Sequence, residues 1–155
     1  MRTSQVFASK EGIRMRPDKD TYYLNIALAV SKRSACLRRH YGCVIVKDDV
    51  IVATGYNGSP RGEVNCCDCG VCQRADAERY SGYEQCPAVH AEQNALLAVD
   101  RVHSQRAVMY LACEYVDDFG AVVEDTDPKP CNLCQRMIAN AGIDKVINRK
   151  GLAWD

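Results

Sequence analysis

Ten cysteines in a chain of 155 residues constrain what this sequence can fold into more than any other feature. Six of them fall into two groups, a dense cluster of Cys66, Cys67, Cys69 and Cys72 and a C-x-x-C pair of Cys131 and Cys134. Close spacing suits tetrahedral thiolate sites on zinc better than loop-closing disulfides. The sequence begins without an apolar leader, and its length suffices to bury a core without disulfides. The pattern predicts a reduced, zinc-binding, cytoplasmic protein.

The charge balance argues against nucleic-acid and membrane partners. The chain has 20 basic and 20 acidic side chains, so its formal net charge is zero and no overall field attracts it to nucleic acid or anionic lipid. No apolar run approaches the roughly 20 residues that span a bilayer. The sequence also shows no basic, aromatic-lined groove for a single strand. We therefore expect neither membrane association nor a stable nucleic-acid partner.

The length and an apolar content of 47% suit a single domain over residues 1–155. Residues 1–19 are polar and predict a loose N-terminal arm. Residues 63–88 hold the cysteine cluster and have no clear hydrophobic period. They predict an insertion that is held by something other than an apolar core.

Hydrophobic periodicity predicts three helices and four strands. The first helix follows Asp20, the candidate N-cap. Its apolar face holds Tyr23, Ile26, Ala27 and Val30. The other helices are expected at 90–99 and 132–141, and the strands at 42–47, 50–56, 107–111 and 145–148. The order of these elements predicts an α/β fold, with a mixed sheet and helices on both faces.

Two segments depart from this regular pattern. Residues 114–129 are acidic and predicted to be irregular, with a short hairpin or flap as the form they would take. A further strand after residue 148 is expected to be very short or absent, because few residues follow.

Two short motifs carry the chemistry, and each opens a predicted helix: His90-Ala91-Glu92 and Pro130-Cys131-Asn132-Leu133-Cys134. Cys131 and Cys134 are three residues apart, so they face the same way over one helical turn. With His90 they supply three zinc ligands and leave a fourth position for water, which is typical of a catalytic zinc. Glu92 can lie beside that position without binding the metal, and can move protons there.

The alternative for these motifs is a closed structural zinc site. Glu92 would then only stabilise the N-terminus of its helix. A lone C-x-x-C pair would favour that interpretation. The combination of H-x-E, a gap of about forty residues and P-C-x-x-C is much more specific, and is the signature of zinc-dependent deaminases. The sequence therefore favours a catalytic site.

The sequence resembles the deoxycytidylate (dCMP) deaminase family, within the cytidine-deaminase fold. The resemblance runs from about residue 20 to residue 148. It is carried by P-C-x-x-C and by the runs TGYNGSPRG (54–62), VHAEQNA (89–95) and MIANAGI (137–143). It implies an α/β/α sandwich with a mixed central sheet and a Cys-rich, zinc-stapled insertion. It also implies hydrolytic deamination of dCMP to dUMP and ammonia in pyrimidine deoxynucleotide metabolism.

The resemblance implies roles for three residues at the site. Glu92 would protonate N3 of the cytosine and then help ammonia to leave. The backbone N–H of Ala91 would help to hold the tetrahedral intermediate. Asn57 would lie near the sugar, although an Asn-Gly pair is also an ordinary turn.

Regulation and assembly are likewise implied by the resemblance alone. Family members are commonly hexamers that dCTP activates and dTTP inhibits. The implied effector residues are Gly55, Tyr56, Gly58 and Arg61. A triphosphate effector would bring Mg²⁺ with it.

Relatives of the phage type, and a bacterial and archaeal-like variant, imply a second, structural zinc. The matching positions are Cys36, Cys66, Cys72 and Cys86. A closed Cys₄ site would tie the insertion to the sheet. Cys67 and Cys69 remain rival ligands, and free buried thiols remain the alternative to any second metal. Cys43 and Cys113 lie in strand patterns and are predicted to be core residues.

A basic cluster follows the first helix and comprises Lys32, Arg33, Arg38 and Arg39. Such a cluster is usually a solvated helix end. The alternative is that it binds an effector or substrate phosphate, because the arginine fork suits phosphate geometry.

Three functions stay open. Family members often run directly from the third strand into T-x-x-P-C, whereas here an acidic stretch separates Tyr115 from Pro130. The substrate could therefore be dCMP, or instead dCTP or a 5-substituted dCMP. From another class, the chain could be a non-catalytic, zinc-stapled nucleotide-binding module. The presence of Glu92 argues against that module, because a structural zinc site has no use for it.

Overall fold

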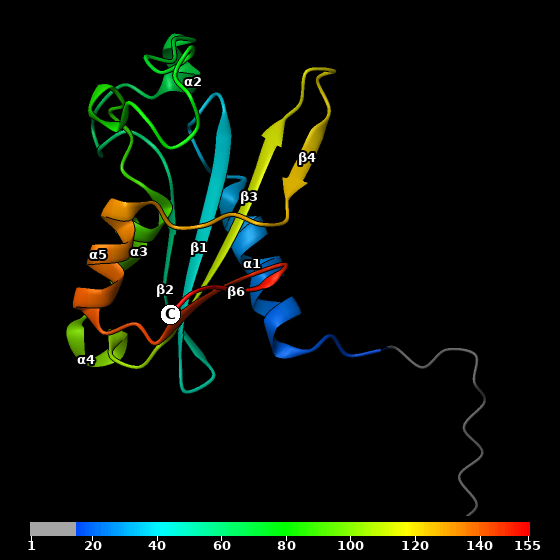
Figure 1. Ribbon diagram of the computed structural model, residues 1–155, viewed down its shortest axis with the longest axis vertical. Helices are drawn as coiled ribbons and strands as arrows, with labels where there is room; N and C mark the ends of the chain where they lie inside the picture. Colours follow the sequence, from blue (N-terminus) through cyan, green and yellow to red (C-terminus); the bar gives the residue numbers. More distant parts are fainter. Residues whose placement is uncertain (1–14) are drawn as a thin grey trace, which may run out of the picture.

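A six-stranded mixed sheet forms the centre of the molecule and carries helices on both faces (Figure 1). The structure is a computed structural model that describes residues 15–155. Its elements are α1 (Lys19–Ser31), β1 (Arg39–Lys47), β2 (Val50–Tyr56), α2 (Cys66–Cys69), the 3-10 helix η1 (Tyr83–Gln85), α3 (Ala91–Ala98), α4 (Arg101–Ser104), β3 (Val108–Val116), β4 (Val122–Asp125), α5 (Asn132–Ala141), β5 (Lys145–Asn148) and β6 (Gly151–Trp154). The predicted α/β class with a mixed sheet is confirmed.

The first two strands form a hairpin with a two-residue turn. Asp48 and Asp49 both have positive φ angles, 48° and 65°, as a type I′ turn requires. The register pairs Lys47 with Val50 across this turn. Strand β2 has the predicted bounds, whereas β1 begins earlier than predicted, at Arg39, because its first residues pair with β3.

Strand β3 organises the sheet because it pairs with three neighbours. It runs antiparallel to β1, while its first half pairs in parallel with β5 and its second half pairs antiparallel with β4. The strand predicted at 107–111 is therefore longer, and it ends at Val116. Residues 114–129 do form a hairpin, and its pairing with β3 makes this stretch more regular than predicted.

Strand β6 is the edge strand next to β5. It has four residues and pairs antiparallel with β5. The further strand expected to be very short or absent is therefore present and short. The sheet order is β2-β1-β3-β5-β6, with β4 beside β3.

Helix α1 begins earlier than predicted, and the prediction of Asp20 as its N-cap is wrong. The N-cap is Asp18, whose carboxylate accepts a hydrogen bond of 2.7 Å from the backbone nitrogen of Thr21. The carboxylate of Asp20 instead accepts a 2.8 Å hydrogen bond from the hydroxyl of Tyr110 on β3. Asp18 and Asp20 are equivalent candidate N-caps in the local sequence, and the contact of Asp20 with the sheet leaves Asp18 as the N-cap.

Each face of the sheet has its own core. Successive residues of β1 point to opposite faces, so Cys43 and Ile45 pack in the core with α3 and α5, and Val44 and Val46 pack with α1. Cys43 and Cys113 are fully buried, as predicted. On α1, Tyr23 and Ala27 are buried as expected. Ile26 and Val30 of the predicted face are only half-buried, and Leu24 is buried in their place.

Two glycines let helices approach the sheet closely. A Cβ atom on Gly42 would lie 1.9 Å from the carbonyl oxygen of Ala27 in α1. A Cβ atom on Gly55 would lie 2.3 Å from the carbonyl oxygen of Ala91, the first residue of α3. The second contact sets the N-terminus of α3 directly on β2, where the site described below is built.

The Cys-rich insertion, residues 63–88, packs without a core of its own. None of its residues is buried. The guanidinium group of Arg38 donates hydrogen bonds to the carbonyl oxygens of Arg74 and Ala77, and so ties the insertion to the start of β1. The insertion and the β3–β4 hairpin project from the same end of the sheet (Figure 1).

The predicted N-terminal arm is only partly described. Residues 15–18 have no regular secondary structure, and Lys19 already belongs to α1. Residues 1–14 of the arm lie outside the described residues.

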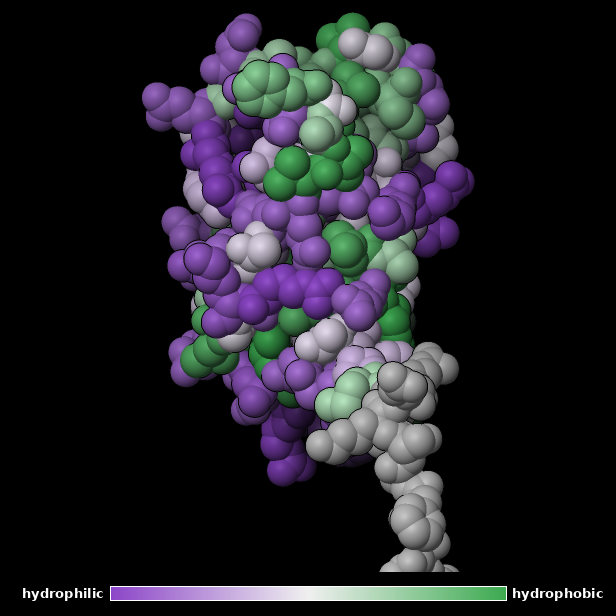
Figure 2. Space-filling view, turned by 90° about the vertical axis from the view of Figure 1, so that its right-hand side faces the viewer, coloured by the Kyte–Doolittle hydropathy of each residue, from purple (hydrophilic) through white to green (hydrophobic). Residues whose placement is uncertain are grey.

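The surface on the side of α1 and the β3–β4 hairpin is mostly hydrophilic, with separate hydrophobic patches (Figure 2). The hairpin contributes three exposed apolar side chains, Val116, Phe119 and Val122. Between residues 15 and 155, no helix is both long and apolar enough to cross a membrane.

Candidate active site

Three metal-ligating side chains converge where α3 and α5 begin. Atom Nδ1 of His90 lies 3.5 Å from Sγ of Cys131 and 3.3 Å from Sγ of Cys134. The ligand atoms of these three residues all lie within 4.8 Å of one another, and within residues 15–155 no other set of His, Cys, Asp or Glu does so. The structure thus brings together the three residues predicted to hold the catalytic zinc.

Helix capping places these ligands. His90 is the N-cap of α3 and Cys131 is the N-cap of α5, both with extended backbone angles. The backbone nitrogen of His90 donates a 2.8 Å hydrogen bond to the side-chain oxygen of Gln93, which fixes the first turn of α3. Cys134 lies one turn further along α5. Because α3 packs against α5, the two helix N-termini present their ligands to one point.

The spacing of the three donor atoms fits a zinc ion. In a tetrahedral site with Zn–S near 2.3 Å and Zn–N near 2.0–2.1 Å, nitrogen and sulfur ligands lie about 3.5 Å apart. The two His90–cysteine separations, 3.5 and 3.3 Å, match that value. One imidazole and two thiols are also a donor set that zinc prefers. The three ligands leave the fourth position open.

Glu92 lies in the first turn of α3 and is only 4% exposed. Burial raises the pKa of its carboxyl group above the ordinary value. A hydrogen bond with Cys131 raises the pKa of His90, which burial opposes. Since Glu92 lies two residues beyond a ligand and borders the same cavity, it is placed to exchange protons with a molecule bound there.

The two thiols at the site are electrostatically unequal. Hydrogen bonds from Cys134 and then from His90 lower the pKa of Cys131 to about 4. The same contact with Cys131, followed by burial, raises the pKa of Cys134. One thiolate therefore forms readily beside His90, which is the form in which a cysteine binds a metal.

A cavity of about 200 Å³ opens beside these residues. Its walls come from β1, the loop after β2, the Cys-rich insertion and the starts of α3 and α5. The charged side chains on the walls are Arg38, Arg39, Arg74, Arg79, Lys129 and Glu92. Five of these six are cationic and the thiolate of Cys131 adds one negative charge, so the walls still carry an excess of cationic side chains although the chain as a whole is neutral.

Asn57 lines this cavity but is also a structural residue. Its side-chain oxygen accepts hydrogen bonds from Ser34 Oγ and Tyr41 N, at 2.7 and 2.8 Å. Its side-chain nitrogen donates a 2.9 Å hydrogen bond to the carbonyl oxygen of Arg39. An amide nitrogen carries two hydrogens, so one N–H of Asn57 remains for a ligand.

Ala91 is also among the residues that line the cavity. It is the first residue of α3 and has no exposed surface. The first N–H groups of a helix have no acceptor within that helix. The N–H of Ala91 is therefore a donor of the kind that stabilises a developing negative charge.

The four predicted effector residues lie outside the cavity walls. Gly55 and Gly58 are buried, the first against α3 and the second in a backbone bridge with Val89. Tyr56 and Arg61 are exposed. The structure gives these glycines structural roles and leaves the effector role of the four residues a prediction.

The cysteines of the insertion divide into two groups. Cys36, Cys66, Cys72 and Cys86 are half-buried, whereas the rival ligands Cys67 and Cys69 are exposed. Burial raises the pKa of Cys66, and the nearby thiols of Cys36, Cys72, Cys86 and, last, Cys69 raise it further, so these residues are neighbours. Their sulfur atoms do not meet the 4.8 Å separation that the His90 site meets.

Sequence reasoning missed several residues of the cavity. Arg74, Arg79, Tyr80 and Tyr83 line it from the insertion, and Lys129 lines it from the loop before α5. Tyr83 packs against the ring of His90 with 5.1 Å between ring centroids. The insertion has no hydrophobic period, so no local signal identified these residues. Of the predicted basic cluster, Arg38 and Arg39 line the cavity and Lys32 and Arg33 do not.

A mixed sheet whose helix N-termini present one histidine, two cysteines and a buried glutamate defines the class of zinc-dependent deaminases. The cytidine and deoxycytidylate deaminase zinc-binding region matches residues 17–149, and the chain belongs to this family.

Named relatives agree with this assignment. The chain is 38% identical to the deoxycytidylate deaminase of Mycobacterium phage D29 over 144 residues, which cover 87% of this chain and 97% of the phage protein. It is 36% identical to the deoxycytidylate deaminase of Schizosaccharomyces pombe over 137 residues, 86% of this chain. The chain spans only 38% of the length of that yeast protein.

The fold also matches solved structures. The dCMP deaminase of cyanophage S-TIM5, in complex with dCMP and dUMP, superposes with a TM-score of 0.59 at 28% identity. The match covers 86% of this chain and 82% of the cyanophage protein. The cytidine-deaminase-like fold predicted from sequence is thereby confirmed.

Proposed function

We propose that this protein hydrolytically deaminates dCMP to dUMP and ammonia. The observation that carries the proposal is the buried carboxylate of Glu92 in the same cavity as His90, Cys131 and Cys134. Support for the substrate comes from the relatives named deoxycytidylate deaminase and from the cyanophage structure with dCMP and dUMP.

The metal of the proposed reaction is zinc, held by Nδ1 of His90 and the sulfur atoms of Cys131 and Cys134. When bound, it would supply Lewis acidity, which provides a water nucleophile at neutral pH. The positive ends of α3 and α5 favour the thiolates that this binding requires.

Glu92 carries the protons of the reaction. Its carboxylate accepts a proton from the attacking water and delivers it to N3 of the cytosine. As the C4–N4 bond breaks, the second proton from the same water passes through Glu92 to the amino group, which leaves as ammonia. Burial of Glu92 keeps both transfers away from bulk solvent. The N–H of Ala91 and the remaining N–H of Asn57 are the proposed donors to the substrate.

The electropositive cavity suits a nucleotide better than a nucleoside. Five cationic side chains face one carboxylate, and a phosphate ester carries up to two negative charges. A substrate panel tests this proposal. Zinc-loaded protein is offered dCMP, dCTP, CMP, 5-methyl-dCMP, deoxycytidine and a cytosine-bearing single strand, and chromatography follows the uracil or thymine product.

We expect dCMP to give the highest kcat/KM in this panel. Preference for dCTP or 5-methyl-dCMP would keep the reaction and replace the substrate. Folded, zinc-loaded protein that converts none of these compounds would contradict the enzyme proposal. It would favour a non-catalytic, zinc-stapled nucleotide-binding module instead.

We also propose a second, structural zinc on Cys36, Cys66, Cys72 and Cys86. These four thiols are half-buried neighbours, whereas Cys69, which is also nearby, is exposed, and the insertion has no buried residue of its own.

Metal counting tests the second site. Elemental analysis is expected to find two zinc ions per chain, and one in the Cys72→Ser variant. The matched control is Cys69→Ser, which alters an exposed thiol of the same segment and should keep both ions. One zinc ion in the wild type, or loss of an ion in the control, would contradict this ligand set.

We further propose how the protein is regulated, how it assembles and where it is located. Gly55, Tyr56, Gly58 and Arg61 belong to the proposed site for dCTP and dTTP, with Mg²⁺ bound to the triphosphate. The protein is proposed to be a cytoplasmic homo-oligomer, with a hexamer as the expected form. Titration of dCMP turnover with dCTP and dTTP, and the mass of the protein in solution, test these points.

A further inference from the structure

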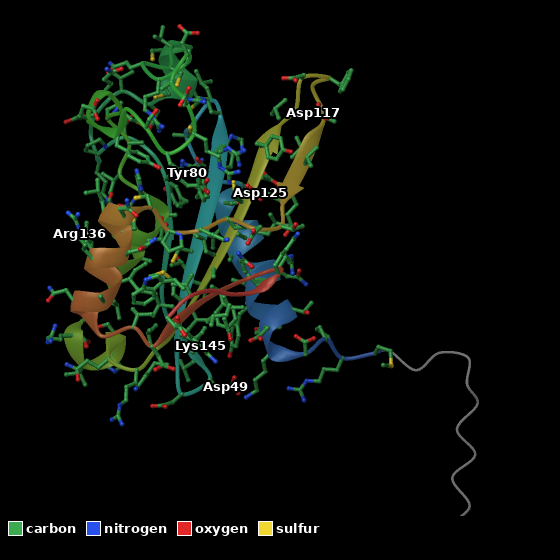
Figure 3. The ribbon with its side chains drawn as sticks, viewed as in Figure 1. Asp49, Tyr80, Asp117, Asp125, Arg136 and Lys145 are labelled. Atoms are coloured by element: carbon green, nitrogen blue, oxygen red, sulfur yellow. The ribbon has the colours of Figure 1, made fainter. Side chains whose placement is uncertain are left out.

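Two arginines from different parts of the chain meet at the same carboxylate oxygen. Nη1 of Arg39 lies 2.8 Å from Oδ2 of Asp125, and Nη2 of Arg79 lies 2.9 Å from the same atom. Arg39 begins β1, Arg79 belongs to the Cys-rich insertion and Asp125 ends β4. The contact therefore joins the insertion to the β3–β4 hairpin. Figure 3 labels Tyr80, the neighbour of Arg79 in the insertion, and Asp125 in the hairpin.

Aromatic rings hold both guanidinium groups. The carbon centre of the Arg39 guanidinium lies 4.7 Å from the ring centroid of Tyr115, and that of Arg79 lies 4.9 Å from the centroid of Tyr80. Stacking of this kind fixes the plane of an arginine fork and so limits the entropy that it loses on binding a ligand.

Asp125 is itself fixed. Its other oxygen, Oδ1, accepts a 3.0 Å hydrogen bond from the backbone nitrogen of Asp127. Burial raises the pKa of this carboxyl group, but the bonds from Asp127, Arg39 and Arg79 outweigh it and leave the pKa lowered. Asp125 is thus an anion at neutral pH that positions two cations.

Most donors of the two arginines remain free for a ligand. A guanidinium group has five N–H donors, and Asp125 engages one nitrogen of each. Both arginines line the cavity that also contains Glu92 and His90, whereas Asp125 is not part of its wall. The guanidinium groups of Arg39 and Arg79 therefore border the cavity with N–H donors to spare, and the carboxylate of Asp125 that binds them lies outside the cavity wall.

The other cations of the cavity are committed elsewhere. Arg38 donates to two carbonyl oxygens of the insertion. Arg74 stacks on Tyr83, which in turn packs against His90 at the metal-ligand end of the cavity. Lys129 lies 3.6 Å from a carboxylate oxygen of Asp127.

We infer that Arg39 and Arg79 bind the 5′-phosphate of the substrate, and that Asp125 is the positioning residue that holds their forks toward it. This inference rests on the proposed function, because it assigns a specificity site for the nucleotide that the enzyme deaminates. The β3–β4 hairpin, which supplies Asp125, thereby acquires a role in distinguishing a nucleotide from a nucleoside.

Paired substrates test the inference. For zinc-loaded wild type, Arg79→Ala, Arg79→Lys and Arg39→Lys, kcat/KM is measured with dCMP and with deoxycytidine, which lacks the phosphate. Removal of a charge-assisted fork in Arg79→Ala should lower the ratio of the two values by about tenfold to a hundredfold. The lysine variants keep the charge and should lose less. Arg33→Ala is the matched control, since Arg33 is exposed and does not line the cavity.

A separate variant tests the role of Asp125. Asp125→Asn keeps the shape of the side chain and removes its charge, so KM for dCMP should rise about threefold to tenfold with kcat within about twofold of wild type. A fall in KM would mean that Asp125 competes with the phosphate, and would overturn its positioning role.

The experiment distinguishes an error in the phosphate site from an error in the proposed function. If the wild type converts dCMP but the ratio is unchanged in Arg79→Ala and Arg39→Lys, the phosphate is bound elsewhere and only this inference is wrong. If the wild type converts no dCMP, the proposed function is wrong and the phosphate site falls with it.

Discussion

The side-chain amide of Asn148 donates a 2.9 Å hydrogen bond to the carbonyl oxygen of Pro128 and thereby ties the end of β5 to the loop before Cys131. The same nitrogen donates a 3.0 Å hydrogen bond to the carboxylate of Asp127. Asn148 is only 2% exposed. A residue outside the metal-ligand motifs therefore fixes the approach of the chain to one of them.

We expect Asn148→Ala to destabilise this loop. The change leaves buried polar groups without a partner and should lower the free energy of unfolding by about 1–3 kcal/mol, with weaker zinc retention. Chemical denaturation and zinc content after dialysis measure both effects. Asn140→Ala is the control, because Asn140 is exposed. Equal stability of the two variants would contradict the role of Asn148.

Gly55 is expected to tolerate no side chain. A Cβ atom there would lie 2.3 Å from the Ala91 carbonyl oxygen and 2.4 Å from the Ala95 backbone nitrogen, and backbone cannot move aside as a flexible side chain can. Gly55→Ala should cost at least about 2 kcal/mol of unfolding free energy through overpacking. It should also lower zinc affinity by moving the start of α3. Thr54→Ala, at an exposed neighbour, is the control; thermal unfolding at equal zinc that ranks the two variants alike would refute the close approach.

The Asp125 cluster predicts a dependence of stability on acid pH. Because the folded-state pKa of Asp125 lies below its ordinary value, its contribution to stability is present above that ordinary value, near pH 4, and is lost as pH falls through the folded-state pKa. Urea denaturation from pH 6 to pH 2.5 should show a shallower loss of stability in Asp125→Asn than in the wild type. Parallel curves would mean that the charge of Asp125 adds nothing to folding.

Metal removal should affect activity and folding separately. A chelator at neutral pH is expected to abolish deamination, because His90, Cys131 and Cys134 lose the ion they are arranged to hold. The melting temperature should also fall, since zinc binds the folded state. Stoichiometric zinc should restore both. Full activity in protein shown by elemental analysis to be free of zinc would contradict a zinc-dependent reaction.

Motif, period and turn chemistry predicted the elements that depend on local sequence. The H-x-E and P-C-x-x-C motifs located the metal ligands because each motif itself carries ligand residues at the spacing of a zinc-dependent deaminase. The bounds of β2, α5 and β5 follow from the local hydrophobic period in the same way.

What depends on tertiary contact escaped prediction. Asp20 and Asp18 are equivalent as candidate N-caps until Tyr110 of β3 engages Asp20. Arg79 acquires its place in the cavity only when the insertion and the β3–β4 hairpin meet at Asp125. Neither the spacing of Arg79 and Asp125 in the sequence nor any hydrophobic period indicates that the two residues meet.

The measurement that tests the central claim most directly compares wild type with Glu92→Gln. Both proteins are brought to the same zinc content, and chromatography measures the conversion of dCMP to dUMP. Glutamine keeps the size of the side chain but cannot transfer protons, so we predict an activity loss of at least about a hundredfold, within the range for lost general acid–base catalysis. Equal rates in the two proteins would contradict the assignment of Glu92 as the proton carrier and, with it, the mechanism proposed for this site.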